Sequence, residues 1–164
     1  MRIVKLALIS FVVLFGLMFF ISALLPSQIR ISRATNIGAS PEKIRTFIGD
    51  LRTWSNWNEL VKDSILQNPQ YDQDIIKSKT LEIELVSNSN NSIRTIWKRG
   101  GRKVESGFNI IPSSDDVTIV QWYFDFSLRW YPWEKFASIV FDKQMGPPME
   151  KSLSNLTNSI EELE

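Results

Sequence analysis

The 164-residue chain carries 19 basic and 18 acidic side chains, and it contains neither histidine nor cysteine. It therefore lacks the usual general base, thiol nucleophile and soft metal ligands, which excludes a zinc site, a Ser-His-Asp triad and a Cys-His pair. The near-neutral charge argues against nucleic acid as a partner, because domains that bind it usually gather a basic excess on one face. We expect no cofactor, no metal and no catalytic residue.

The segment from Leu6 to Leu25 is an uncharged apolar run. As a helix it would rise about 30 Å, the thickness of a bilayer's hydrocarbon core. A cleaved signal peptide usually has a shorter apolar stretch and small residues at its exit, whereas this run ends in Leu24 and Leu25. We predict a transmembrane anchor over residues 1–26 and one separate domain over residues 27–164. A cleaved signal and a buried core helix are the alternatives.

The charges that flank the run bear on its orientation. Arg2 and Lys5 precede it together with the chain's amino terminus, and Arg30 and Arg33 follow it. Because positive charge favours the cytoplasmic side, this small asymmetry predicts a single-pass protein whose domain lies on the outer, periplasmic side of the inner membrane. The absence of cysteine is compatible with that location.

The first half of the domain begins with a strand and continues with helices. Residues 29–37 alternate between apolar and polar side chains, which predicts a half-buried strand. Ser40 and Pro41 then favour a helix start, since serine caps helices and proline suits their first turn. Trp54 and Trp57 follow on a second short helix or turn, and residues 58–79 show no clear pattern.

An antiparallel meander is predicted for the next part of the chain. Four stretches alternate with period two between turn-forming separators, namely 80–87, 92–99, 103–111 and 117–128. The last is the clearest, because its even-numbered residues from Val120 to Leu128 are all apolar. The basic cluster from Lys98 to Lys103 has two central glycines, and we interpret it as a solvated hairpin turn.

The chain ends in a predicted amphipathic helix. Residues 133–141 favour a short helix or a further strand, and Gly146-Pro147-Pro148 is expected to open the final helix. An apolar stripe then recurs at steps of four and three, formed by Met149, Leu153, Leu156, Ile160 and Leu163. Burying five such side chains would contribute about 8–15 kcal/mol at most, so this helix is expected to belong to the fold.

Three segments carry a family resemblance: Ala39–Phe47, Asp50–Trp57 and Met145–Leu156. Together with the element order they resemble the START-like (SRPBCC) superfamily, which has polyketide-cyclase-like and lipid-transport members. A membrane-anchored bacterial subgroup is similar in having Leu-Pro before the first strand, as in Leu25-Pro26. The resemblance implies an α+β helix-grip fold, an antiparallel curved sheet wrapped around a long C-terminal helix, here preceded by one transmembrane helix.

The resemblance also implies an apolar cavity between sheet and helix. We therefore predict a membrane-tethered module that binds a hydrophobic small molecule or lipid, with the bilayer as its other partner. The expected lining residues are aromatic or apolar side chains of the strands and the final helix: Trp97, Phe108, Trp122, Phe124, Phe126, Met149, Leu153 and Leu156. The same side chains would also serve as ordinary core, and nothing in the sequence indicates an oligomeric state.

Two alternatives remain open. One is a protein-interaction module with a filled core. The other is a cyclase-like or dehydratase-like enzyme, which would need Asp125, Tyr123 or Glu105 inside the cavity. Strand alternation places Asp125 and Tyr123 opposite the aromatic face, which argues against catalysis. The pair Asp115-Asp116 fits a solvated turn.

Overall fold

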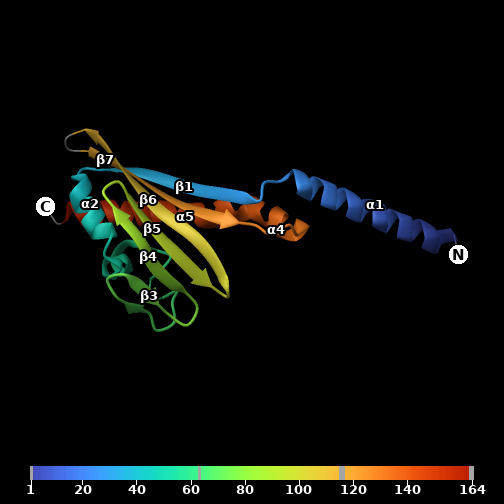
Figure 1. Ribbon diagram of the computed structural model, residues 1–164, viewed down its shortest axis with the longest axis horizontal. Helices are drawn as coiled ribbons and strands as arrows, with labels where there is room; N and C mark the ends of the chain where they lie inside the picture. Colours follow the sequence, from blue (N-terminus) through green and yellow to red (C-terminus); the bar gives the residue numbers. More distant parts are fainter. Residues whose placement is uncertain (1, 63, 115–116, 163–164) are drawn as a thin grey trace.

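The computed structural model describes residues 2–62, 64–114 and 117–162, so Leu163 and the pair Asp115-Asp116 lie outside the described residues. Its first element, α1 (Arg2–Leu24), projects away from the rest of the chain (Figure 1). This helix is long and apolar enough to cross a membrane, a property that signal sequences share. Ser22 is its one buried residue among those described.

The domain is built on a seven-stranded antiparallel sheet with the order β1-β7-β6-β5-β4-β3-β2. The strands are β1 (Gln28–Ile37), β2 (Gln70–Tyr71), β3 (Ile75–Lys77), β4 (Glu82–Ser89), β5 (Ser92–Arg99), β6 (Arg102–Ser114) and β7 (Val117–Ser127). Strands β4 to β7 form the predicted meander, whereas β2 and β3 lie in the segment 58–79 for which the sequence showed no clear pattern. Strand β1 is the edge strand of the sheet and pairs with β7, so that Ile31 lies opposite Phe124.

Three short helices cover the end of the sheet that lies farthest from α1 (Figure 1). These are α2 (Pro41–Ile48), the 3-10 turn η1 (Leu51–Thr53) and α3 (Trp54–Trp57). Ser40 caps α2 as predicted, because its side-chain oxygen accepts a hydrogen bond from the Lys43 backbone N–H at 3.4 Å. The Trp54 indole N–H donates to the Ile48 carbonyl at 2.8 Å, which ties α3 back to α2.

The long C-terminal helix begins earlier than the sequence indicates. After α4 (Pro132–Ala137) and η2 (Ser138–Val140), helix α5 runs over Phe141–Glu161, so the expected start at Gly146-Pro147-Pro148 is wrong. Both prolines lie inside the helix, although each lacks the N–H that would close a helical hydrogen bond. Phe141 and Met145 pack against the core, and this burial favours the additional turn.

An arginine from β1 holds this first part of α5. Arg33 forms ion pairs with Asp142 at 2.9 Å and with Glu150 at 2.6 Å, one on each side of the Gly-Pro-Pro segment. A Cβ atom at Gly146 would lie 2.2 Å from the Arg33 guanidinium, so a larger residue there would require the arginine side chain to move. The tertiary contact therefore offsets the poor helix propensity of this segment.

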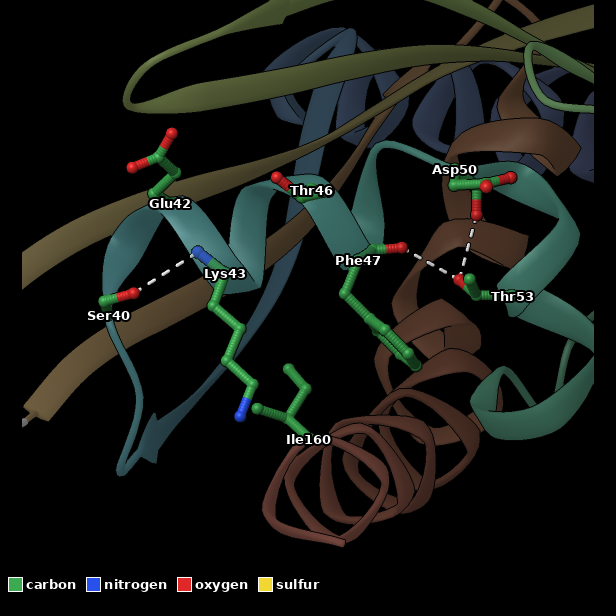
Figure 2. Close-up of a pocket in the computed structure, with 8 residues that line it drawn as sticks. All are labelled: Ser40, Glu42, Lys43, Thr46, Phe47, Asp50, Thr53 and Ile160. Carbon is green, nitrogen blue, oxygen red and sulfur yellow. Dashed lines mark hydrogen bonds between the residues drawn. The ribbon is translucent and has the colours of Figure 1, made fainter. Parts of the chain in front are cut away.

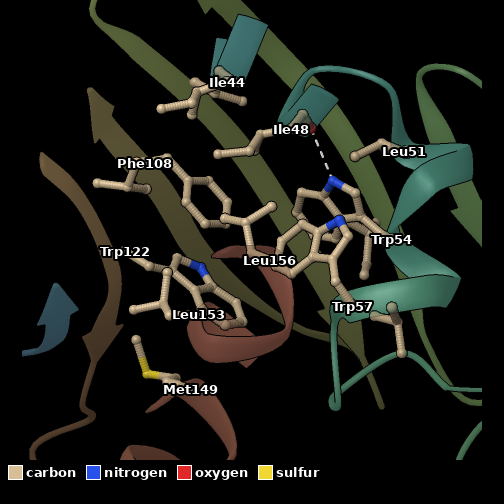
Figure 3. Close-up of a cluster of buried hydrophobic side chains, with 14 of the residues drawn as sticks. Ile44, Ile48, Leu51, Trp54, Trp57, Phe108, Trp122, Met149, Leu153 and Leu156 are labelled. Carbon is tan, nitrogen blue, oxygen red and sulfur yellow. Dashed lines mark hydrogen bonds between the residues drawn. The ribbon is translucent and has the colours of Figure 1, made fainter. Parts of the chain in front are cut away.

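The core between the sheet and α5 is aromatic and filled (Figure 3). Phe108 and Trp122 stack at 5.2 Å between ring centroids, and the edge of Trp57 meets Trp122 at 6.2 Å. The predicted stripe of α5 is buried from Met149 to Ile160. The architecture is the expected α+β helix-grip fold, with a curved antiparallel sheet around a long C-terminal helix.

Candidate functional site

A groove of about 710 Å³ opens where α4 and the start of α5 face the ends of β5, β6 and β7. We call it the α4 groove. Its volume falls within the range of small-molecule sites, about 300–1,000 Å³. The described chain places it at the end of the domain from which α1 projects, since α4 lies beside the last turns of α1 (Figure 1).

The inner wall of the α4 groove is aromatic. Trp97 and Phe124 meet edge to face at 5.0 Å, and Phe126 approaches Phe141 of α5 at 5.1 Å. The alternation of β7 directs Phe124 and Phe126 to the same side of the sheet, and β5 directs Trp97 there as well. Three of the eight predicted lining residues therefore meet in one wall: Trp97, Phe124 and Phe126.

The other five predicted residues lie in the filled core. Phe108, Trp122, Met149, Leu153 and Leu156 expose at most 2% of their surface, and none of them lines the α4 groove. The space that the structure offers to a ligand is therefore displaced toward the α1 end of the domain. The groove walls also include Leu60, Val104, Ala137 and Met145, which the sequence analysis did not single out.

The rim of the groove is polar and mainly basic. The Glu134 carboxylate of α4 accepts hydrogen bonds from the Arg102 side chain at 2.8 Å and from the Arg129 backbone N–H at 3.0 Å. Arg99 and Lys103 lie on the same rim. The interpretation of residues 98–103 as a solvated turn was thus incomplete. Two glycines do form the turn, at φ +56° and +77°, but the flanking cations border the groove.

The candidate acids for catalysis lie away from this groove. The Asp125 carboxylate accepts two hydrogen bonds from the Arg30 guanidinium, at 2.7 and 2.6 Å, and Arg30 lies 4.3 Å from the centre of the Tyr123 ring. The hydrogen bond that Arg30 donates to Asp125 is the main cause that raises the pKa of Arg30. Glu105 is exposed. Within the described residues, no group of three His, Cys, Asp or Glu side chains could hold a metal ion.

A second hollow, of about 550 Å³, lies at the opposite end of the domain between α2 and the end of α5 (Figure 2). Six of its eight lining residues are polar or charged, and several of their polar groups already form hydrogen bonds within the fold. The Thr53 hydroxyl donates to the carbonyls of Phe47 and Asp50 at 2.8 and 2.9 Å. The Asp50 carboxylate binds Arg52, whose hydrogen bond lowers the pKa of Asp50. The α4 groove is the better candidate, because it is larger and five aromatic residues line it, whereas Phe47 is the one aromatic residue that lines the second hollow.

A curved antiparallel sheet that grips a long C-terminal helix, with an apolar hollow between them, defines the START-like (SRPBCC) class of proteins. The sequence model of the polyketide cyclase/dehydrase and lipid transport family matches residues 28–161. The chain belongs to this family.

Solved structures show the same fold. A START superfamily protein from Mycobacterium smegmatis aligns with a TM-score of 0.59 at 19% identity, covering 82% of this chain and 99% of that one. Norcoclaurine synthase from Thalictrum flavum, solved with dopamine and hydroxybenzaldehyde, aligns with a TM-score of 0.63 at 11% identity, covering 88% and 92%. At these identities the likeness concerns the fold alone. No curated protein matches the chain.

Proposed function

We propose that this protein is a membrane-tethered module that binds a hydrophobic small molecule or a lipid in the α4 groove. One observation carries the proposal: an apolar groove of about 710 Å³ lies at the end of the domain from which a helix of membrane-spanning length projects. The family description, polyketide cyclase/dehydrase and lipid transport, supports a hydrophobic ligand.

Binding would rest on the exclusion of water. An apolar ligand gains about 25 cal/mol for each Å² of apolar surface that it removes from water. Because Trp97 and Phe124 expose only 7% and 2% of their surface, this surface belongs mainly to the ligand itself, Phe126 and Trp133. Glu134 and the cations of the rim would orient a polar end of the ligand, since few but well-placed polar groups usually set orientation in such sites. This mode of action needs no catalytic group.

The tether would keep the groove near the bilayer. Helix α1 ends at Leu24 and β1 begins at Gln28, so hardly any linker separates the proposed anchor from the sheet. The charge asymmetry around the anchor supports a domain on the outer, periplasmic side. A freely diffusing carrier would be incompatible with this arrangement, whereas a fixed groove that faces the membrane agrees with it.

Native mass spectrometry of the full chain, released from detergent micelles, tests the proposal. We expect a bound hydrophobic molecule, and we expect Ala137→Trp to abolish it, because Ala137 is exposed in the groove wall and an indole there fills the space. Ala34→Trp is the matched control, since Ala34 is an exposed alanine on β1 outside the groove.

A groove that stays empty in the wild type, and that binds nothing from a panel of lipids, would overturn the proposal. That result would favour the protein-interaction module, for which the filled core around Phe108 and Trp122 is the supporting observation.

A further inference from the structure

The segment from Trp130 to Val140, which we call the aromatic segment, carries large apolar side chains on the surface. Trp130, Trp133, Ile139 and Val140 expose 66%, 59%, 65% and 43% of their surface. Elsewhere in the described chain after α1, the large exposed hydrophobic residues are isolated ones: Ile65, Val86 and Ile111. A concentration of this kind within eleven residues indicates a surface that meets an apolar partner.

The rings of this segment are ordered without being buried. Tyr131 and Trp133 stack with ring centroids 4.8 Å apart and planes 8° apart, and Trp130 packs against Tyr131 at 4.8 Å. Tryptophan and tyrosine combine an apolar body with a polar edge, which suits the boundary between hydrocarbon and water.

The position of Trp130 beside α1 indicates that the apolar partner of this surface is the membrane. Its ring lies 5.9 Å from the ring of Phe19, inside the apolar run of α1. Phe19 precedes Leu24 by five residues, so it lies roughly 8 Å down the helix axis from the end of α1. If α1 spans a bilayer, the ring of Trp130 therefore reaches below the edge of the hydrocarbon core, while the rest of the segment continues toward the end of α1.

A buried lysine fastens the aromatic segment at this depth. The Lys135 ammonium donates to the carbonyls of Ser22 and Leu25 at 3.0 and 2.9 Å, and only 7% of the residue is exposed. These carbonyls lie at the C-terminal end of α1, where helical carbonyls lack partners and where a cation is favoured. The segment and the anchor therefore form one unit.

We propose that the aromatic segment is a second membrane contact, which lies in the interfacial layer of the bilayer that α1 crosses. Tryptophan and tyrosine concentrate in this layer in membrane proteins. The inference rests on the proposed function, because it takes α1 as a retained anchor. Trp133 and Ala137 belong both to this segment and to the groove wall, so the groove opens at the lipid surface and a ligand exchanges with lipid without crossing water.

Tryptophan fluorescence of the full chain in phosphatidylcholine vesicles tests the inference. The quenchers are phosphatidylcholines brominated on the acyl chains, close to the head group or close to the chain end. Four of the six tryptophans, at 54, 57, 97 and 122, expose at most 7% of their surface, so the interfacial signal comes from Trp130 and Trp133. We expect stronger quenching by bromine near the head group than by bromine near the chain end.

The double variant Trp130→Phe/Trp133→Phe should lose most of this quenching. Its near-ultraviolet circular dichroism should keep the bands of the four core tryptophans, because the two replaced rings are exposed. Equal quenching in the variant and the wild type would overturn the inference. It would assign the signal to Trp97, which borders the groove, and so to a brominated lipid bound there.

Extraction of the vesicles at alkaline pH separates the two proposals. A chain that stays in the membrane but shows no quenching overturns the interfacial contact and leaves the tether in place. A chain that is washed out shows that α1 does not anchor it, and the interfacial contact then fails with the tether. Both the tether and the interfacial contact are supported if the chain stays in the membrane, is quenched by bromine near the head group, and loses this quenching in the double variant.

Discussion

The two ends of the helix-grip domain use the same strands but differ in what covers them. At the end far from α1, Trp54 and Trp57 of α3 pack onto Phe108 and Trp122, and all four rings are fully buried (Figure 3). At the end near α1 no tryptophan of comparable burial enters from α4 in the described chain, and the inward side chains of β7 border an open groove. Whether the aromatic face of a strand is packed in the core or lines a groove therefore depends on the helix that covers it, α3 at one end and α4 at the other.

The strongest test of this comparison is Trp122→Ala in the closed end. Trp122 is fully buried, stacks on Phe108 and donates its indole N–H to the Ser106 hydroxyl at 2.9 Å. Truncating a buried tryptophan leaves a cavity, so we expect the free energy of unfolding to fall by about 3–5 kcal/mol. Denaturant unfolding of the full chain in detergent, followed by near-ultraviolet circular dichroism, measures it. A loss below about 1 kcal/mol would contradict a filled core.

The same strand offers the matched change in the open end, Phe126→Ala. Phe126 is only partly buried and borders the groove. We expect it to cost about 1–2 kcal/mol, less than a fully buried aromatic side chain, because water already reaches part of the site. Phe126→Ala should also lower the fraction of protein that carries ligand in native mass spectrometry. Relative to the stability that each variant loses, this decrease should be larger for Phe126→Ala than for Trp122→Ala. Equal unfolding costs for the two variants would remove the distinction between the ends.

Lys135→Met addresses how the open end is joined to α1. The substitution keeps an unbranched apolar stem but removes the ammonium group that donates to the Ser22 and Leu25 carbonyls. We expect faster proteolysis between α1 and β1, and a loss of about 1 kcal/mol in the free energy of unfolding, because two carbonyls lose a buried donor. Lys151→Met, a change on the exposed surface of α5, is the control. Unchanged proteolysis would show that Lys135 does not fasten the joint.

The smallest expected effect concerns acid pH and the start of α5. The hydrogen bond from Arg33 is the main cause that lowers the pKa of the Asp142 carboxyl below its ordinary value. Because the folded state has the lower pKa, the stabilisation is present above the unfolded pKa and is lost as the pH falls through the folded one. The stability of the wild type should therefore decline more steeply below about pH 4 than that of Asp142→Asn. Identical acid profiles in denaturant titrations would show that the pair contributes nothing.

Local patterns were sufficient for most of the fold. The alternation in β7 predicted its buried face, Ser40 predicted the start of α2, and the stripe from Met149 to Ile160 predicted the buried side of α5. Each of these features depends on side chains that lie close together in the sequence, where periodicity and capping act directly. The family motifs predicted how the elements assemble.

The candidate site was predicted only in part. Trp97, Phe124 and Phe126 border the groove, but Phe108 and Trp122, which share the same alternation, are packed in the core. No periodic pattern distinguishes these two groups, because the difference comes from α3 at one end and α4 at the other. The early start of α5 has a similar cause, since Arg33 is more than a hundred residues away from Gly146 along the chain.

The sequence by itself determined an apolar helix of membrane-spanning length, the long strands β1 and β4 to β7 with their inward faces, and most of α2 and α5, because these follow from composition and period. Only the tertiary structure decided where the inward face stays open, that the basic turn borders the opening, and that Trp130 lies beside Phe19. These are contacts between residues distant in sequence, and they depend on how the helices pack against the sheet and not on any local pattern.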